Sequence, residues 1–379
     1  MMPEMNLSPV LGEPSWQLKS NLVRLALTRK GGQLGPVAFR IGQKTIQPFH
    51  VAPWHGEAAT RAAIPPILRV LRGDFFCMPF GGNEAPYGKE RHPAHGETAN
   101  RDWKLEAVTD SSIRATLKTR VRAGKVIKEI SLREGETALY MRHQLDGFTG
   151  PMSFGHHAML KFDSPARIST SPFVFGQVFP GEFENPAIGG YTSLKAGARF
   201  QSLSRVPLAA GGPADLSRYP AREGFEDLVM VCADPKRPLA WTAAAFPQEG
   251  YVWFALKDPR VLASTVLWHS NGGRHYAPWN GRHRAVLGLE EVTSYFHLGI
   301  AKSAAKNPVS ARGIPTSVTL SAKKPLVINY VMAVAPIPAK FGAVKSITPI
   351  SGGVRLKDGG GRAVEVAVDT AFLAEKKKP

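Results

Sequence analysis

Apolar or small residues alternate with polar ones through much of this chain. The stretches Ile113–Val121 and Ala138–Leu145 both show the pattern, with an apolar or small side chain at every second position. This spacing is typical of half-buried β-strands. A third strand is predicted between them over Val126–Leu132, and it ends at the turn Arg133–Glu136. Three consecutive strands with short turns predict an antiparallel meander.

The same pattern recurs along the rest of the chain, interrupted by glycine-rich turns such as Asn271–Gly273 and Asp358–Gly361. Long amphipathic helices are missing, and short helices are predicted only over Glu57–Ala63, Pro213–Tyr219 and Ala371–Lys376. Many strands and few helices predict a mainly β protein, a large antiparallel β-sandwich. The further predicted strands are Leu228–Cys232, Tyr251–Lys257, Val261–His269, Ala285–Ile300, Leu326–Val334 and Ala363–Val368.

No linker divides the sequence, so we expect one β-sandwich domain over residues 1–379. The region from about 168 to 224 is rich in Pro and Gly and poor in regular strands, which is typical of a long insertion that forms one wall of a pocket. The strand pattern from about 340 to 379 predicts a terminal layer on the same sandwich. No fixed internal repeat is visible, which argues against a propeller.

The net charge of +18 makes nucleic acids and anionic substrates conceivable partners. The basic residues are scattered, however, and their one dense run is Lys376–Lys378. We therefore expect no nucleic-acid partner, while an acidic or phosphorylated small ligand stays an alternative. The sequence does not indicate an oligomeric state.

Targeting signals and cysteine chemistry are not prominent either. The sequence contains no run of about 18 apolar residues, so no membrane span is predicted. The first residues lack the basic start and apolar core of a secretory signal, so we expect a cytoplasmic location. Cys77 and Cys232 are too few for a disulfide framework or a four-cysteine metal site, and we expect two buried thiols.

Three segments carry residues suited to catalysis. His95 stands in a loop rich in Gly, Pro and small polar residues, His156–His157 follows a glycine turn, and Glu290–Glu291 interrupts an apolar strand. Because neighbouring strand side chains point to opposite faces, at most one member of each pair is expected inside. A buried carboxylate needs polar partners. One carboxylate and one or two histidines could act as general base and general acid.

Metal and nucleophilic chemistry have less support. The sequence contains no His-Glu-x-x-His, no close His-x-His and no cysteine-rich pair, so no metal site is expected. It also contains no Gly-x-Ser-x-Gly, the turn that presents a nucleophilic serine.

These residues resemble the aldose 1-epimerase family, the galactose mutarotase-like proteins, over roughly residues 16–300. His95–Gly96, followed by Asn100 and Trp103, looks like the family's His-Gly loop. The run VIKEISLREGETALYMRHQLDGFTGPMSFGHHAMLKF is similar to its central block, and AVLGLEEVTS resembles the strand with the catalytic glutamate.

The resemblance implies a β-sandwich with the active cleft on its concave face and interconversion of the α and β anomers of a sugar, with no cofactor. It implies that Glu290 is the base that takes the proton from the anomeric hydroxyl. His157 would protonate the ring oxygen, so that the ring opens to the aldehyde and recloses on its other face. His95 would hold the sugar. All three side chains are then expected to meet at one sugar ring.

Departures from the family pattern leave two alternatives open. Ala99 stands where sugar-phosphate members carry an arginine, and Ala158–Leu160 replaces a proline and aromatic residues. One alternative is a carbohydrate-binding or regulatory protein on the same fold that lacks turnover. The other is a lyase or hydrolase acting on an anionic polysaccharide.

Further residues are predicted to contact the sugar, each with a structural role as its alternative. Trp279 could stack on a pyranose face, and His269, Arg274 and His275 are close enough in sequence to line the same mouth. The other predicted substrate contacts are Arg72, Asp74, Asn83, Asn100 and His156.

Overall fold

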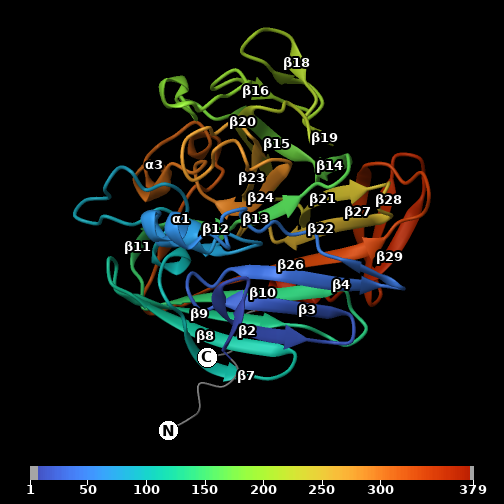
Figure 1. Cartoon of the computed structure of the whole chain (residues 1–379), viewed down its shortest axis with the longest axis horizontal. Helices are drawn as coiled ribbons and strands as arrows, with labels where there is room; N and C mark the ends of the chain where they lie inside the picture. The colour runs from blue at the N-terminus through green and yellow to red at the C-terminus, as the bar shows by residue number, and fades with distance from the viewer. Residues whose placement is uncertain (1–6, 376–379) are drawn as a thin grey trace. The chain divides into compact units, whose positions relative to one another are not determined.

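The computed structural model describes residues 7–375, and most of its regular structure is antiparallel β-sheet (Figure 1). This confirms the predicted fold class. The chain divides into two compact units. Unit one comprises the described residues up to Ala158, together with Val292–Asn329 and Glu375. Unit two comprises Met159–Glu291 and Tyr330–Ala374.

Unit one begins with an antiparallel sheet of five strands in sequential order. On the second strand the buried Trp16 and Leu18 alternate with the exposed Gln17 and Lys19, so this part of the strand has one buried and one open face. The strands are β1 (Ser8–Val10), β2 (Glu13–Lys19), β3 (Val23–Thr28), β4 (Leu34–Ile41) and β5 (Lys44–Ile46).

The predicted meander is the second sheet of unit one. Strands that follow one another in the sequence pair in this meander, with Ile113 opposite Ile130 and Ile130 opposite Met141. Lys128 of the meander donates to the carbonyl of Gly32 at 2.7 Å and so connects it to the N-terminal sheet. The strands are β7 (Lys104–Val108), β8 (Ser112–Thr119), β9 (Gly124–Ser131) and β10 (Ala138–Asp146).

Short elements complete unit one. In β12 (Phe154–His156), Gly155 pairs with Cys77 of β6 (Phe76–Cys77) and with Val292, in the last part of β24 (Val286–Thr293). The predicted helix Glu57–Ala63 is confirmed as α1 (Ala58–Ala63). The remaining elements are α2 (Pro66–Arg69), a 3₁₀ helix at Glu97–Ala99, β11 (Gly150–Met152), α3 (Gly299–Ala304), a 3₁₀ helix at Ser310–Arg312 and β25 (Val318–Leu320).

Unit two contains two facing sheets, and nearly every residue of their central strands is buried. One sheet has the order β16 (Arg199–Phe200), β15 (Phe173–Val178), β20 (Phe225–Ala233), β23 (Ser264–Asn271) and β24, which also pairs with β13 (Ala158–Lys161). The other has the order β19 (Arg218–Tyr219), β14 (Ala166–Thr170), β21 (Ala240–Phe246), β22 (Tyr251–Lys257) and β26 (Leu326–Pro336).

Two sequence predictions are wrong in detail. Residues 213–219 form the short strands β18 (Pro213–Ala214) and β19 instead of a helix, because Pro220 disfavours helical backbone at Tyr219. β18 pairs with β17 (Val206–Pro207). The strand expected to reach Ile300 ends at Thr293, and α3 follows it.

The C-terminal part of unit two is a meander of β27 (Val344–Ile350), β28 (Gly353–Asp358) and β29 (Ala363–Ala367). It contacts β14 and β21 through its first strand. The predicted C-terminal helix is a 3₁₀ helix at Thr370–Ala374. The basic run Lys376–Lys378 lies outside the described residues.

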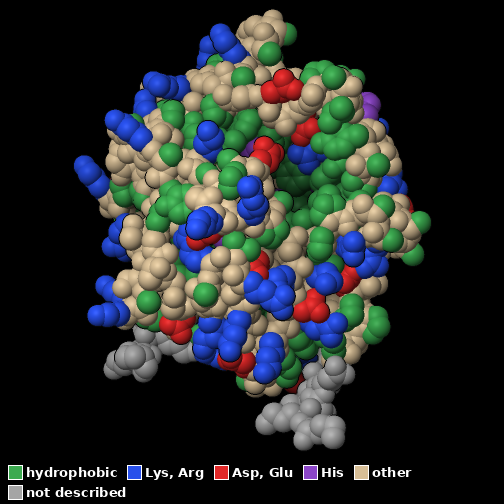
Figure 2. Space-filling model, turned by 90° about the vertical axis from the view of Figure 1, so that its left-hand side faces the viewer, with side chains coloured by type: hydrophobic (Ala, Val, Ile, Leu, Met, Phe, Trp, Pro, Cys, Tyr) green, Lys and Arg blue, Asp and Glu red, His purple; other side chains and the backbone are tan. Residues whose placement is uncertain are grey.

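The surface carries many basic side chains, and Figure 2 shows Lys and Arg spread over one face with Asp and Glu between them. The thiols of Cys77 and Cys232 are both buried, as expected. Among residues 7–375, no helix is long and apolar enough to cross a membrane.

Candidate functional site

His95 lies in a loop of unit one whose backbone is held by the side chain of Asn83. The amide nitrogen of Asn83 donates to the carbonyls of Gly81 at 3.0 Å and Pro93 at 3.1 Å. The backbone N–H of His95 donates to the carbonyl of Gly81 at 2.6 Å. The amide of Asn83 thus serves the main chain, and this geometry does not support its predicted contact with a sugar.

Asn100 holds the same loop from another side. Its Nδ2 donates to the carbonyls of Ala94 at 2.7 Å and Gly96 at 2.8 Å, while its Oδ1 accepts from the N–H of Ile67 at 3.2 Å. A Cβ on Gly96 would lie 1.8 Å from the carbonyl oxygen of Met78, so only glycine fits after the histidine. The side chain of Asn100 therefore shapes the loop, and its predicted sugar contact is likewise unsupported.

The two histidines expected to act together in unit one do lie together. His95 has a φ of +57°, a conformation that non-glycine residues adopt rarely and often at functional sites. Its ring stands edge-on to that of His157, with 5.0 Å between centroids. The ring of His157 stacks on Phe75 at 4.6 Å, and its backbone N–H donates to the Phe75 carbonyl at 3.0 Å.

The environment of His95 keeps its imidazole neutral. Burial lowers the pKa of His95 well below its usual value, and the nearby His157 and His297 lower it further. Its Nδ1 is buried without a hydrogen-bond partner among residues 7–375. Phe75, Phe80 and His297 also belong to this group, and no sequence pattern predicted them. A Cβ on Gly81 would lie 2.3 Å from the carbonyl oxygen of His297, so the glycine allows the two segments to approach closely.

Both histidines of the pair at the end of β12 are buried, which corrects the expectation that at most one would be. His156 is fully buried and its Nδ1 lies 2.9 Å from Oδ2 of Asp74. Its ring also lies edge-on to His143 at 5.0 Å. Other parts of unit one cover both faces of this short strand. His156 and Asp74 therefore pair with each other in the interior, and their predicted sugar contacts gain no support.

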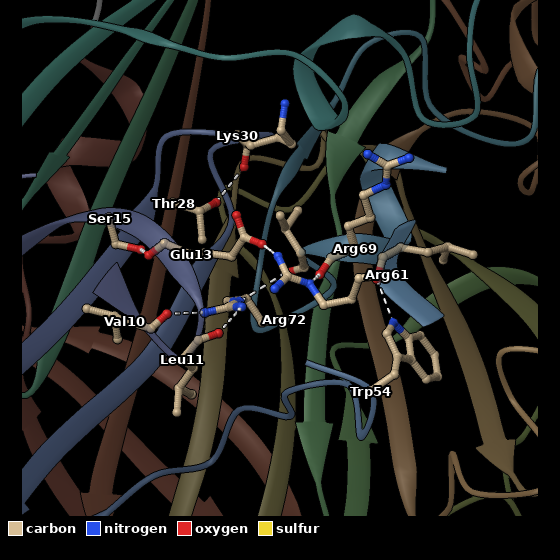
Figure 3. A network of polar contacts seen from close by, with 12 residues as sticks. Val10, Leu11, Glu13, Ser15, Thr28, Lys30, Trp54, Arg61, Arg69 and Arg72 are labelled. Carbon is tan, nitrogen blue, oxygen red and sulfur yellow. Dashed lines mark hydrogen bonds and ion pairs between the residues drawn. The ribbon is translucent and has the colours of Figure 1, made fainter. Parts of the chain in front are cut away.

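Arg72 is also internal (Figure 3). Its side chain is fully buried, and its guanidinium donates to the carbonyls of Val70 at 3.0 Å, Val10 at 3.0 Å and Leu11 at 3.1 Å. Burial lowers its pKa to about 10, so it stays charged at neutral pH. These bonds fasten the start of the N-terminal sheet, and a role for Arg72 in sugar binding is not supported by them.

In unit two, both Glu290 and Glu291 of β24 are buried, at 2% and 1% exposure, whereas one was expected in solvent. Glu291 faces the opposite sheet, where it forms an ion pair with Lys257 and accepts a hydrogen bond from Thr242, and it also accepts one from Thr265 of the neighbouring strand β23. These partners compensate for burying the carboxylate. The opposite sheet covers the Glu291 side of this strand, and Glu290 is buried on the other side.

Glu290 points to the other face of its sheet, beside Trp268 of the neighbouring strand. A Cβ on Gly288 would lie 2.6 Å from Oε1 of Glu290 and 3.1 Å from Cβ of Trp268. The glycine therefore leaves the space that the carboxyl group occupies. Burial raises the pKa of Glu290 well above its usual value. A carboxyl group perturbed in this way is typical of a general acid or base.

Aromatic and charged side chains surround Trp268 on this face. The ring of His283 stacks on it at 5.2 Å, and Trp279 stands edge-on at 6.0 Å. The guanidinium of Arg274 lies 4.6 Å from the Trp279 ring centroid and 5.2 Å from that of Trp268. Glu184 accepts from Nε of Arg274 at 2.6 Å. The predicted residues Trp279 and Glu290 are thus both neighbours of Trp268.

Glu226 is a buried acid that the sequence analysis missed. Its carboxylate accepts hydrogen bonds from Nε1 of Trp268 at 2.9 Å, Oγ of Ser270 at 2.9 Å and the N–H of Gly273 at 3.2 Å. Burial raises its pKa to about 7. Its position at the start of an apolar run was the one available signal. Among residues 7–375, no group of three or more His, Cys, Asp or Glu is arranged to hold a metal ion.

No protein-family model and no curated protein matches this sequence. Solved structures do resemble it. A candidate aldose 1-epimerase of Escherichia coli K12 has 13% identity and a TM-score of 0.57, over 85% of this chain and 99% of that one. A galactose mutarotase related enzyme of Lactobacillus acidophilus has 12% identity and a TM-score of 0.55, over 86% and 99%.

A galactose mutarotase-like protein of Lactobacillus casei has 13% identity and a TM-score of 0.54, over 85% of this chain and all 100% of its own. At these identities the likeness concerns the fold. The chain has the fold of the aldose 1-epimerase and galactose mutarotase-like proteins, as the sequence resemblance implies.

Proposed function

We propose that this protein binds a sugar and interconverts its anomers by general acid–base catalysis. The observation that carries the proposal is Glu290, a buried carboxyl group with a raised pKa beside Trp268. It lies on a strand of a fold shared with proteins named as aldose 1-epimerases and mutarotases. The neighbouring rings of His95 and His157 in unit one add support.

In the proposed reaction, Glu290 takes the proton from the anomeric hydroxyl while a general acid gives a proton to the ring oxygen. The electron pair of the O–H bond forms the carbonyl, and the bond between the anomeric carbon and the ring oxygen breaks. Rotation about the first carbon–carbon bond exposes the other face of the aldehyde. Ring closure returns both protons, so no net transfer remains.

A second candidate is a protein that binds a sugar without turnover. It is favoured by the internal use of five side chains that were expected to contact the sugar. Those side chains are Arg72, Asp74, Asn83, Asn100 and His156.

Exchange NMR on freshly dissolved aldoses tests the proposal. We expect faster anomerisation with the protein than with buffer alone, and a loss of about 10²–10⁴-fold in Glu290→Gln, since one general base contributes that much. Binding of the sugar, measured as a thermal shift, should persist in this variant. Glu223→Gln is the matched control, because this carboxylate of the same unit is 70% exposed.

Each result distinguishes the candidates. If every aldose in a broad panel relaxes at the buffer rate but some raise the melting temperature, the protein binds without turnover. If Glu290→Gln folds and keeps the full rate, Glu290 is not the base.

A further inference from the structure

We infer that Glu226 is a positioning residue that fixes the indole of Trp268, and that this indole keeps water from the carboxyl group of Glu290. The inference rests on the proposed function for its catalytic meaning, although its geometry stands independently. Glu226 would act through Trp268 and would not touch the sugar.

The hydrogen bonds of Glu226 leave it little freedom. One carboxylate oxygen accepts from Nε1 of Trp268 at 2.9 Å, and the other accepts from Ser270 and Gly273. The side chain is fully buried. A buried carboxylate with three internal donors is fixed in orientation, because losing any one bond leaves a polar group unsatisfied. The indole N–H of Trp268 is therefore held at a defined point.

The same hydrogen bonds extend to the face of the indole. Oγ of Ser270 lies 2.6 Å from Nδ1 of His283, and the ring of His283 stacks on Trp268 with an interplanar angle of 15°. Glu226 thus fixes the position of the indole N–H directly and, through Ser270, that of the His283 ring that stacks on the indole.

The register of the sheet connects this group to Glu290. Glu226 lies opposite Ser270 in the pairing of β20 with β23, so both point to the same face as Trp268. Oε1 of Glu290 and Cβ of Trp268 approach the same point above Gly288. An apolar ring beside a carboxyl group disfavours its charged form, which agrees with the raised pKa of Glu290.

Several charged or titratable groups also face Glu226. Arg274 lowers its pKa, and Glu184 raises it. Tyr219 interacts with it electrostatically, and His283 contacts it through Ser270. A change at Glu226 must therefore be compared with a change at Trp268 to isolate the effect that passes through the indole.

The test follows the titration of the Glu290 carboxyl by NMR in protein labelled with ¹³C-glutamate, with the signal assigned by its loss in Glu290→Gln. In Glu226→Gln one accepting oxygen is replaced by an NH2 group that faces a donor, so not all three hydrogen bonds can form, the indole loosens and water reaches Glu290. We expect the Glu290 titration to move to lower pH by about one unit or more. Trp268→Ala should move it in the same direction.

The double variant is the decisive measurement. If Glu226 acts through Trp268, Glu226→Gln combined with Trp268→Ala shifts the titration no further than Trp268→Ala alone. Glu223→Gln is the control and should leave it unchanged. Additive shifts, or an unshifted Glu290 in a folded Glu226→Gln protein, would overturn the inference.

Two further measurements keep the outcomes separate. If Glu226→Gln does not fold, Trp268→Phe removes the indole N–H while keeping an aromatic ring. The Glu290 titration should then move to lower pH by less than in Trp268→Ala. An unchanged titration in Trp268→Phe contradicts the inference. If the wild-type protein has no effect on any sugar, the proposed function fails, yet the carboxyl titration still decides the role of Glu226.

Discussion

At the scale of single residues, burial shifts the pKa values of Glu290 and His95 in opposite directions. It raises the pKa of Glu290 and lowers that of His95, because in each case the charged form is disfavoured. Burial therefore favours the protonated form of Glu290 and the neutral form of His95. Glu290 can act as a base only once it has lost its proton.

The first prediction concerns the pH dependence of the proposed reaction. Anomerisation should rise with pH through a limb that lies well above the ordinary carboxyl pKa of 4.5, because Glu290 must be deprotonated to accept a proton. Since its folded pKa is raised, its contribution to stability is present at low pH and is lost as pH rises through that pKa. The measurement is kcat/KM against pH, and a limb near the ordinary value would contradict it.

Some of these residues could be predicted from sequence and others could not. The resemblance named His95 and His157, and their rings do lie 5.0 Å apart. Because strand side chains alternate, only one member of each pair, His156–His157 and Glu290–Glu291, was expected to be buried. His156 and Glu291 are buried as well. Sequence alternation reports the direction of a side chain and not whether the opposite face is covered. Their partners Asp74 and Lys257 are distant in sequence.

At the scale of elements, strand prediction worked where apolar residues alternate regularly and failed where proline or glycine intervened. Ile113–Val121 corresponds to β8 and Val126–Leu132 to β9, each within two residues at either end. The wrong predictions fall at Pro213–Tyr219 and after Thr293. There, local backbone restrictions and tertiary packing decide the structure.

The second prediction concerns the contact between the two sheets of unit two. Lys257 and Glu291 form a buried ion pair, at 2% and 1% side-chain exposure. Lys257→Met should lower the free energy of unfolding by about 3–5 kcal/mol, because it leaves Glu291 charged and unpaired. Replacing both, as in Lys257→Met with Glu291→Leu, should restore much of that loss. Urea unfolding measures each difference.

Lys161→Met is the matched control for this prediction. Lys161 pairs with Asp163 at the surface, with 41% and 67% side-chain exposure, and such pairs contribute about 1 kcal/mol or less. Equal stability of wild type and Lys257→Met would show that the buried pair is not needed for the packing of these strands.

At the scale of the whole molecule, each unit contains a buried neutral histidine, and the chain is strongly basic. His143 lies in unit one and His269 in unit two, and burial lowers the pKa of both well below the usual value. Neither ring nitrogen of His143 has a hydrogen-bond partner among residues 7–375, and a backbone hydrogen bond at Leu267 offsets only part of the effect of burial on His269. Protonating them in the folded state is costly, and the net charge of +18 adds general repulsion in acid.

The third prediction is therefore a loss of stability in mild acid. Because the folded pKa values are depressed, the stability linked to these histidines is present above their unfolded pKa of 6.5. It is lost as pH falls from there toward the folded values. The urea midpoint should fall steeply below about pH 6.5, and less steeply in His143→Phe, which keeps the stacking on Phe76 at 3.9 Å. Identical slopes would contradict the role of His143.

The loop around His95 has a consequence for the diversification of this protein. Asn83 and Asn100 bind carbonyl oxygens, which every amino acid supplies, so apart from Gly81 and Gly96, where a Cβ would clash, the loop can keep its course with other side chains. Exposed positions such as Glu84 and Ala94 are then open to exchange without displacing the imidazole. Natural drift or a combinatorial library could vary them to reach new ligands at little risk to folding.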